Sequence, residues 1–449
     1  MAEKTATLSE RLWELANAIL ARVKEYREQG GLVSMRSWYV KPVVSNFEYK
    51  EGGTSFQTSF QNVEKEEWHW RDQHEFIEKA IKPLPAYVSS LATIVDRYAI
   101  AREQADFWLV RFAQLLASRA TEAVSDGFLV DQVTTFINDL EKTPVDWEVV
   151  AWLDGIWLED DAYDLPGKML LRRPKPADIE VERQIDVLPF GSPFGLQFLP
   201  SAVLELQLRG REGVEIQRDL ESILHVLRLY RLGSITASKV RLNPKSFVSF
   251  GGVLGPGRHV GAAHKYKFTK DDVKLFTELL AKLRPVLPVP FIESGDIDPV
   301  TIAFQRYQEA LLQPVAFESR ITSAITCLEA LYLKAEERME LSHRLGQRAA
   351  ALLGLFGQNA LEVYKSLVRA YEVRSVFIHG SQIEKNQQQA LPKVSETVME
   401  YARLSLVIFF QLKQLMDKER LLNKLDNSLL DGNAQAKLRE TVTKDILVS

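Results

Sequence analysis

The sequence predicts an α+β protein, in which an N-terminal region of mixed helix and sheet is followed by a bundle of helices. Three observations lead to this fold class. The 449 residues exceed what one hydrophobic core usually organises, so we expect more than one domain. Residues 203–208 alternate apolar and polar side chains, as a half-buried strand does. After Pro299, apolar residues recur at the spacing of a helix instead.

Composition places the chain among globular proteins and narrows its partners. Hydrophobic residues make up 46% of the chain, charged residues 26%, and the formal net charge is -4. This balance argues against a protein that binds nucleic acid over its whole surface, although a local basic cleft remains possible. The longest strongly apolar run, 404–412, is too short to span a bilayer, and the charged N-terminus does not resemble a signal peptide. We therefore expect a cytoplasmic protein without membrane contact.

Residues 1–145 are predicted to be mostly helical. The expected elements are a helix over 8–27, strand-like residues 32–49, a turn at 52–53, and helices over 63–120 and 131–142. Thr7 or Ser9 is the expected cap of the first helix. Pro42 interrupts the strand-like segment, because proline cannot donate a ladder hydrogen bond.

Residues 146–290 are predicted to form a mixed α+β module. The expected strands are 149–158, 165–171, 203–208, 235–242 and 247–253, and the expected helices are 214–232 and 271–283. Gly233 ends the first of these helices. The prolines between residues 285 and 290 are typical of a linker to the next region.

Residues 298–420 are predicted to form an antiparallel helical bundle, because amphipathic segments are joined there by short loops. The expected helices are 301–313, 318–335, 340–354, 361–379 and 394–418. The last part, 421–449, is expected to be a largely polar tail with one or two weaker helical turns.

The segment 371–380 carries the main candidate for chemistry. Arg374 falls on the apolar face of the predicted helix, where a guanidinium needs a partner or a cleft because burying it alone is costly. His379 follows five residues later, and Gly380 is a helix stop. We therefore expect His379 at the helix C-terminus, where the helix dipole favours the protonated imidazole.

An arginine and a histidine together suit transfer at a phosphate. The histidine can move a proton while the arginine stabilises charge on the phosphoryl oxygens, and this chemistry requires no metal. The alternative is structural: Arg374 pairs with a neighbouring carboxylate, and His379 merely caps its helix. The spacing alone leaves both interpretations open.

Other motifs give weaker signals. His69 and His74 lack the spacing of a zinc motif and have no evident third ligand, so we predict no metal site and no cofactor. The glycine-rich segment 251–259 lacks the lysine and hydroxyl of a phosphate-binding loop and is expected to join two strands. The acidic residues between 159 and 164 are expected in a solvated turn. Cys327 is expected to be buried, and a lone cysteine forms no intrachain disulfide.

Several C-terminal segments resemble the HEPN superfamily, and within it the ApeA-like HEPN domains. These segments are 328–332, 344–353, 371–375 and 378–380, with Glu340 between the first two. The resemblance covers about residues 298–418, and Glu329 and Arg348 lie in the segments where the family leads us to expect them. HEPN domains are helical bundles, and many are metal-independent endoribonucleases with an Arg-x4-6-His motif. Arg374 and His379 match that motif with four intervening residues.

The resemblance implies a C-terminal HEPN-type bundle that cleaves RNA. It implies that His379 moves a proton as the ribose 2′-hydroxyl attacks the phosphate, while Arg374 stabilises the transition state. It further implies that Tyr371, Ser375 and Arg348 bind substrate or support the site. Many family members carry Asn, Asp or His where this chain has Ser375. The implied partners are a second copy, paired through the bundle, and an antitoxin or defence protein in a prokaryotic toxin–antitoxin or antiviral system.

Two alternatives to a nuclease remain open. One is a non-catalytic HEPN scaffold in which Arg374 fixes a dimer interface; it predicts two buried, satisfied motif side chains, whereas a nuclease needs an open basic cleft. The other is a nucleotide-sensing regulator that acts through residues 146–290. Segments 153–156, 171–174 and 226–233 weakly resemble the N-terminal part of such proteins, which implies a sensing or targeting module.

Overall fold

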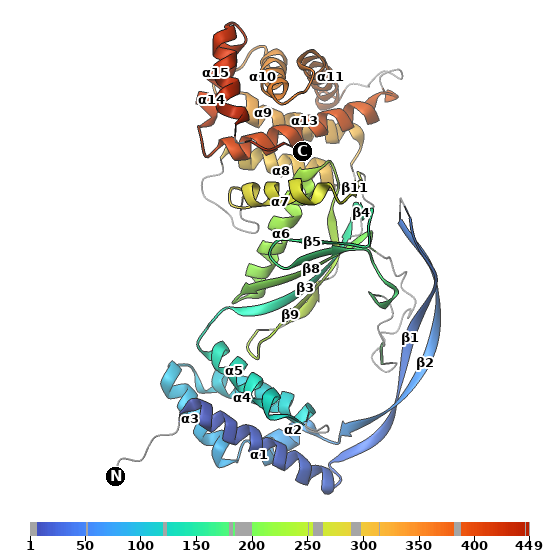
Figure 1. Ribbon diagram of the computed structural model, residues 1–449, viewed down its shortest axis with the longest axis vertical. Coiled ribbons are helices and arrows are strands. Elements are labelled where there is room, and N and C mark those ends of the chain that lie inside the picture. Colours follow the sequence, from blue (N-terminus) through green and yellow to red (C-terminus); the bar gives the residue numbers. More distant parts are fainter. Residues whose placement is uncertain are drawn as a thin grey trace.

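The computed structural model has three parts stacked along its longest axis: N-terminal helices, a sheet flanked by two helices, and a C-terminal bundle (Figure 1). It describes residues 7–50, 53–119, 124–178, 183–184, 200–249, 251–254, 264–288, 298–313, 315–380, 388–444 and 446–448. The mixture of helices and sheets, with helices in the C-terminal region, confirms the coarse fold class predicted from the sequence.

The N-terminal helices form a hydrophobic cluster of their own. They are α1 (Leu8–Glu28), α2 (Gln73–Phe76), α3 (Pro85–Tyr98), α4 (Arg102–Arg119) and α5 (Asp126–Leu140), with a π-helical turn η1 over Ile77–Ile81. Thr7 begins α1, because its side chain accepts from the N–H of Glu10 while the Glu10 carboxylate accepts from the N–H of Thr7. Of the two predicted caps, Thr7 and Ser9, the structure therefore has Thr7.

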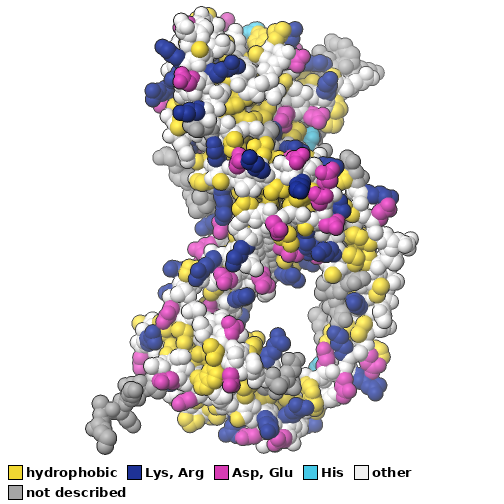
Figure 2. All heavy atoms as spheres, in the orientation of Figure 1, with side chains coloured by type: hydrophobic (Ala, Val, Ile, Leu, Met, Phe, Trp, Pro, Cys, Tyr) yellow, Lys and Arg dark blue, Asp and Glu magenta, His cyan; other side chains and the backbone are white. Residues whose placement is uncertain are grey.

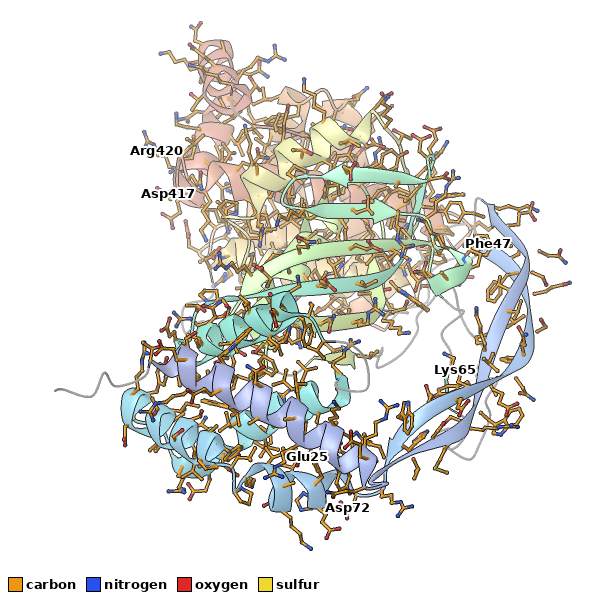
Figure 3. The ribbon with its side chains drawn as sticks, turned by 60° about the horizontal axis from the view of Figure 1, so that its bottom comes forward. Glu25, Phe47, Lys65, Asp72, Asp417 and Arg420 are labelled. Atoms are coloured by element: carbon orange, nitrogen blue, oxygen red, sulfur yellow. The ribbon has the colours of Figure 1, made fainter. Side chains whose placement is uncertain are left out.

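A long antiparallel hairpin, β1 (Leu32–Lys50) and β2 (Gly53–Trp70), extends from these helices to the sheet. The predicted helix over 63–120 was therefore wrong at its start, since residues 63–70 belong to β2. Charged residues 64–67 have good helix propensity, and a two-stranded hairpin has no fully buried face to impose alternation. Figure 3 shows Asp72 at the base of the hairpin and Phe47 near its far end.

Tyr49 attaches the far end of the hairpin to the sheet part. Its Oη donates to the carbonyl of Ser201 at 2.7 Å and accepts from the N–H of Leu158 at 2.8 Å. The guanidinium carbon of Arg173 lies 4.9 Å from the Tyr49 ring centroid. A short strand β7 (Arg183–Gln184) also pairs with β1. The hairpin, the N-terminal helices and the sheet part thus border an opening through the molecule (Figure 2).

The central sheet has the strand order β10-β9-β3-β8-β6-β5 among the described residues. Its strands are β3 (Val145–Asp154), β5 (Ala162–Leu165), β6 (Met169–Arg172), β8 (Ala202–Gly210), β9 (Thr236–Pro244) and β10 (Gly252–Leu254). All paired neighbours are antiparallel. Alternate residues of β3 are buried, and α6 (Gly213–Tyr230) and α7 (Asp272–Leu283) pack beside the sheet (Figure 1). The middle region therefore holds the main sheet, as predicted.

Turns divide several of the predicted strands. The predicted strand 149–158 is split at Gly155, whose φ of +88° and whose closeness to the Ser234 carbonyl leave no room for a side chain. The second piece, β4 (Ile156–Leu158), pairs in parallel with β11 (Tyr266–Phe268). The predicted strand 165–171 instead contains the turn between β5 and β6, and a 3₁₀ turn η2 (Pro176–Asp178) follows.

The C-terminal bundle contains the expected helices. They are α8 (Pro299–Leu312), α9 (Phe317–Tyr332), α10 (Leu341–Leu355), α11 (Ala360–Ile378) and α13 (Leu391–Leu412). The polar tail is more regular than predicted, because it forms α14 (Lys418–Ser428) and α15 (Gly432–Thr443). Asp417 caps α14 by accepting from the N–H of Arg420 at 2.7 Å (both labelled in Figure 3).

The sheet part and the bundle share one hydrophobic cluster, whose buried residues run from Val145 to Val442. Arg403 of α13 ties them together, since its Nη1 donates to the last carbonyls of α6, Leu229 at 2.6 Å and Tyr230 at 2.8 Å. This buried arginine compensates the negative end of the α6 dipole. Over the described residues, none of the helices combines the length and apolar character that crossing a bilayer demands.

Candidate functional site

The motif segment forms the end of α11, as its periodicity predicts. Asn359 caps the start of the helix by accepting from the N–H groups of Leu361 and Glu362 at 3.1 and 3.3 Å. The last helical residue is Ile378, and His379 is the C-cap. Gly380 then adopts φ +69°, a left-handed conformation that glycine accepts without strain. The predicted glycine stop is confirmed.

Arg374 points back toward α9, where it finds the carboxylate partner that its place on the helix demands. Its Nη2 lies 3.0 Å from Oε2 of Glu329. The hydroxyl of Tyr371 donates to the other carboxylate oxygen at 2.9 Å. The guanidinium carbon also lies 5.2 Å from the centroid of the Tyr371 ring. Glu329 therefore orients two side chains of α11 at once.

This trio is only partly withdrawn from solvent. The side chains of Arg374 and Glu329 are 22% and 18% exposed. Burial raises the pKa of Tyr371, and the charge of Glu329 raises it further, so the phenol remains a hydrogen-bond donor at neutral pH. The Nε of Arg374 is buried and has no hydrogen-bond partner among the described residues. The Nε–H of Arg374 therefore makes no hydrogen bond within the part of the protein that the structure describes.

His379 is exposed beyond the last turn of α11. Its backbone N–H donates to the carbonyl of Ser375 at 3.1 Å, whereas its imidazole makes no hydrogen bond or ion pair within the described part of the chain. Phe377 and Ile378 beside it are 42% and 53% exposed. No ion pair or hydrogen bond of the described residues joins His379 to Arg374. The scaffold interpretation predicts that both motif side chains are buried and have hydrogen-bond partners. Arg374 meets this prediction only in part, and the exposed His379 does not meet it.

Ser375 is half-buried on the same turn of α11, and its carbonyl holds the backbone of His379. Its hydroxyl has no hydrogen bond among the residues that the structure describes. Where many HEPN domains carry Asn, Asp or His, this chain therefore has the small hydroxyl group of Ser375 beside Arg374.

Arg348 has a structural role. Its side chain is 2% exposed, and all of its N–H groups are used. They donate to the Glu337 carboxylate at 2.7 and 2.8 Å, the Asp426 carboxylate at 2.7 and 2.9 Å, and the Tyr332 carbonyl at 2.7 Å. Burial by itself would raise the pKa of the Glu337 carboxyl, but Arg348 lowers it to about 2. The contacts tie α10 to α14 and to the end of α9, and they leave no donor for a substrate.

A groove of about 620 Å³ lies along α11 next to this segment. Its walls are apolar residues of α11 and α13, with Lys365, Arg369 and Glu372 as the charged groups. Lys365 and Arg369 form no ion pair within the described ranges. Sequence reasoning did not find this groove, although the two cations lie one turn apart on the predicted helix. The groove is a concave, partly basic surface whose lining includes Val373 and Val376, one residue before and two residues after Arg374 in the chain.

The other sequence candidates are accounted for by local contacts. The Nε2 of His69 lies 2.7 Å from the Ser37 hydroxyl, and His74 is an exposed residue of α2. In the acidic segment 159–164, two carboxylates pair with Lys267 and Arg173. The part of the chain that the structure describes contains no cluster of His, Cys, Asp or Glu able to hold a metal ion.

Cys327 is buried, as predicted, and burial raises the pKa of its thiol. Of the glycine-rich segment, residues 252–254 form β10 at the edge of the sheet. The predicted loop over 255–259 lies outside the described residues.

No protein family, no curated protein and no solved structure matches this chain. The resemblance of the C-terminal segments to HEPN domains therefore remains a prediction.

Proposed function

We propose that this protein is a metal-independent endoribonuclease of the HEPN type, acting in the cytoplasm in a prokaryotic toxin–antitoxin or antiviral system. One observation carries the proposal: α11 presents an exposed His379 at its C-terminus, while Glu329 and Tyr371 hold Arg374 on the same helix. An accessible imidazole and an oriented guanidinium are the groups that transfer at a phosphate needs.

In the proposed reaction the ribose 2′-oxygen attacks the adjacent phosphorus. His379 moves one of the two protons, either accepting it from the 2′-hydroxyl or donating it to the departing 5′-oxygen; water exchanges the other proton, and the phosphorus–O5′ bond breaks. The products are a 2′,3′-cyclic phosphate and a 5′-hydroxyl. Arg374 stabilises the non-bridging oxygens as charge builds on them. DNA lacks the 2′-hydroxyl and is not cleaved.

A second copy of the chain completes the site in this proposal. A two-fold pairing of α11 ends would place two Arg374/His379 pairs around one cleft, because a two-fold interface juxtaposes the same surface of both copies. The exposed Phe377 and Ile378 beside His379 supply apolar surface for such a pairing. The basic groove with Lys365 and Arg369 gives the RNA backbone a path toward the motif. An antitoxin or defence partner would then restrain the nuclease.

The alternative function is a non-catalytic scaffold. The observation that favours it is the Arg374–Glu329 ion pair, in which Nη2 of the guanidinium already has a carboxylate partner inside the bundle. In that case Arg374 stabilises the packing of α11 on α9, and His379 only ends its helix.

The deciding experiment incubates the purified protein with labelled RNA in excess EDTA. Wild type should cleave the RNA, His379→Ala should be slower by about 10²–10⁴-fold, and Arg374→Lys should also fail because an ammonium cannot replace the guanidinium fork. His74→Ala is the matched control, since this histidine is also exposed but lies on α2. Absence of cleavage by wild type would favour the scaffold, whereas equal cleavage by wild type and His379→Ala would remove the proposed role of His379.

A further inference from the structure

A cavity of about 860 Å³ lies at the joint between the N-terminal helices and the sheet part. Its walls come from the ends of α3 and α5, from α4, from β3, from the start of α6, and from residues 248–249. The motif segment contributes nothing to it. Cavities of this size at a boundary between structural parts are the usual form of small-molecule sites.

The joint itself is held by a loop that crosses from one part to the other. Phe247 follows β9 of the sheet, yet its ring lies 5.4 Å from Phe112 and 5.6 Å from Phe136 in the N-terminal cluster. The Asp139 carboxylate at the end of α5 accepts from the N–H of Phe247 at 2.6 Å. Asp139 lines the cavity. A ligand in this cavity would therefore contact both the N-terminal helices and the sheet part, next to the Asp139–Phe247 hydrogen bond that connects them.

Three aromatic side chains from three elements line the cavity: Tyr98, Trp108 and Trp147. The Trp147 indole is fixed in place, because its Nε1–H donates to the Gly210 carbonyl at 3.1 Å. The hydroxyl oxygen of Tyr98 is buried without a hydrogen-bond partner among the described residues. A buried hydroxyl without a partner is destabilising, and a polar group of a ligand would supply the missing hydrogen bond. Flat rings beside an unmet hydroxyl suit a planar aromatic ligand with polar edges.

The same cavity carries uncommitted positive charge at its rim. Arg211 and Lys142 are exposed lining residues whose side chains form no ion pair within the described ranges. The start of α6 at Gly213 also lines the cavity, and its N-cap residue makes no side-chain hydrogen bond. Glu215 in the first turn offsets part of the positive end of the dipole, while its carboxylate accepts from the backbone N–H of Arg211 at 2.7 Å.

Two of the lining carboxylates have partners within the protein. Glu141 pairs with Arg97 at 3.2 Å, and Asp139 accepts backbone N–H groups. Glu212, the N-cap residue of α6, is the lining carboxylate that has no side-chain partner within the described ranges, and Arg211 and Lys142 line the same cavity. The balance at this rim favours an anionic group, and phosphate is the anion that a helix N-terminus with nearby Arg and Lys binds well.

We propose that this cavity binds a nucleoside phosphate. The base lies against Trp108 and Tyr98, with the buried Trp147 beneath, and the phosphate meets Arg211, Lys142 and the start of α6. The bound nucleotide bridges the N-terminal helices and the sheet part, so that its binding stiffens the joint at Phe247. This role is independent of the proposed nuclease, whose residues lie on α11 and α9.

The test titrates the full-length protein with AMP, GMP, CMP and UMP, each followed by calorimetry and by tryptophan fluorescence, since Trp108 and Trp147 line the cavity. At least one nucleotide should bind saturably at one site per chain. Adenosine or inorganic phosphate alone should bind at least about tenfold more weakly, because each offers only half of the contacts. No saturable binding of any of the four up to about 1 mM overturns the proposal.

Two variants locate the site. Arg211→Gln should weaken binding by about tenfold or more, the value of a charge-assisted hydrogen bond. Arg209→Gln is the matched control: Arg209 is exposed two residues earlier in β8, and its Nε donates to the Pro144 carbonyl. Tyr98→Phe, which removes only the hydroxyl, should weaken binding several-fold. Circular dichroism checks that each variant is folded. Equal loss in Arg209→Gln and Arg211→Gln, or full affinity in Arg211→Gln, would contradict this placement of the phosphate.

Discussion

The guanidinium of Arg374 and the carboxylate of Glu329 lie 3.0 Å apart and join the last turns of α11 to the last helical turn of α9. The same carboxylate accepts from Tyr371. The orientation of the proposed phosphate-binding group is therefore set by a residue 45 positions earlier in the chain. Glu329 acts as a positioning residue if the nuclease proposal holds.

Glu329→Gln should lower the rate of RNA cleavage by about 10²-fold, because a displacement of about 1 Å at a catalytic group costs that much. The amide keeps the size of the carboxylate but loses its charge, so kcat should fall while KM changes little. Steady-state kinetics with labelled RNA separate the two parameters. A gain in RNA affinity without a loss of kcat would mean that Glu329 only neutralises Arg374.

Arg348→Met should destabilise the bundle by about 3–5 kcal/mol, because it leaves the carboxylates of Glu337 and Asp426 without their buried partner. Arg344→Met is the matched control on the same helix. Arg344 also pairs with Glu337, at 3.2 Å, but it is 44% exposed and its loss should cost less than about 1 kcal/mol. Urea unfolding measures both, and similar losses would show that burial of the pair is not what matters.

The pKa of Glu337, lowered to about 2 by Arg348 against the opposing effect of burial, predicts a loss of stability in acid. The folded pKa lies below the unfolded value of about 4.5, so the stabilisation is complete above pH 4.5 and declines as the pH falls toward 2. In that window unfolding takes up about one proton at this site, which corresponds to a slope near 1.4 kcal/mol per pH unit. Glu337→Gln should lack this slope in urea unfolding between pH 2 and 5. An unchanged slope would assign the acid sensitivity to other carboxyls.

The sequence was sufficient for features set by local pattern. The period of apolar residues and Gly380 placed the end of α11 within one residue, and the requirement that Arg374 have a partner also followed from its place on the helix. The identity of the partner did not, because it depends on how α9 packs on α11. The strand over residues 63–70 was missed since its charged residues favour a helix and no core opposes it. The interdomain cavity gave no local signal, as its walls come from segments far apart in the chain.

The hairpin offers a further test, because Tyr49 attaches its far end to the sheet part. Burial raises the pKa of Tyr49 to about 12, so the phenol keeps its proton at neutral pH and can donate to Ser201 while it accepts from Leu158. The ring also lies under Arg173. The hydroxyl and the ring thus make separate contributions to the attachment.

Tyr49→Phe should open this attachment without unfolding the protein. It removes two hydrogen bonds, worth about 1–3 kcal/mol together, but keeps the ring under Arg173. Backbone amide hydrogen exchange at Leu158 should accelerate by about tenfold or more, because that N–H loses its acceptor and the local opening free energy falls. Tyr39→Phe is the control, since the Tyr39 hydroxyl donates to Glu67 within the hairpin. If exchange at Leu158 is the same in both variants, the hydroxyl of Tyr49 does not hold the hairpin in place. Other contacts would then attach the hairpin to the sheet part beside the opening seen in Figure 2.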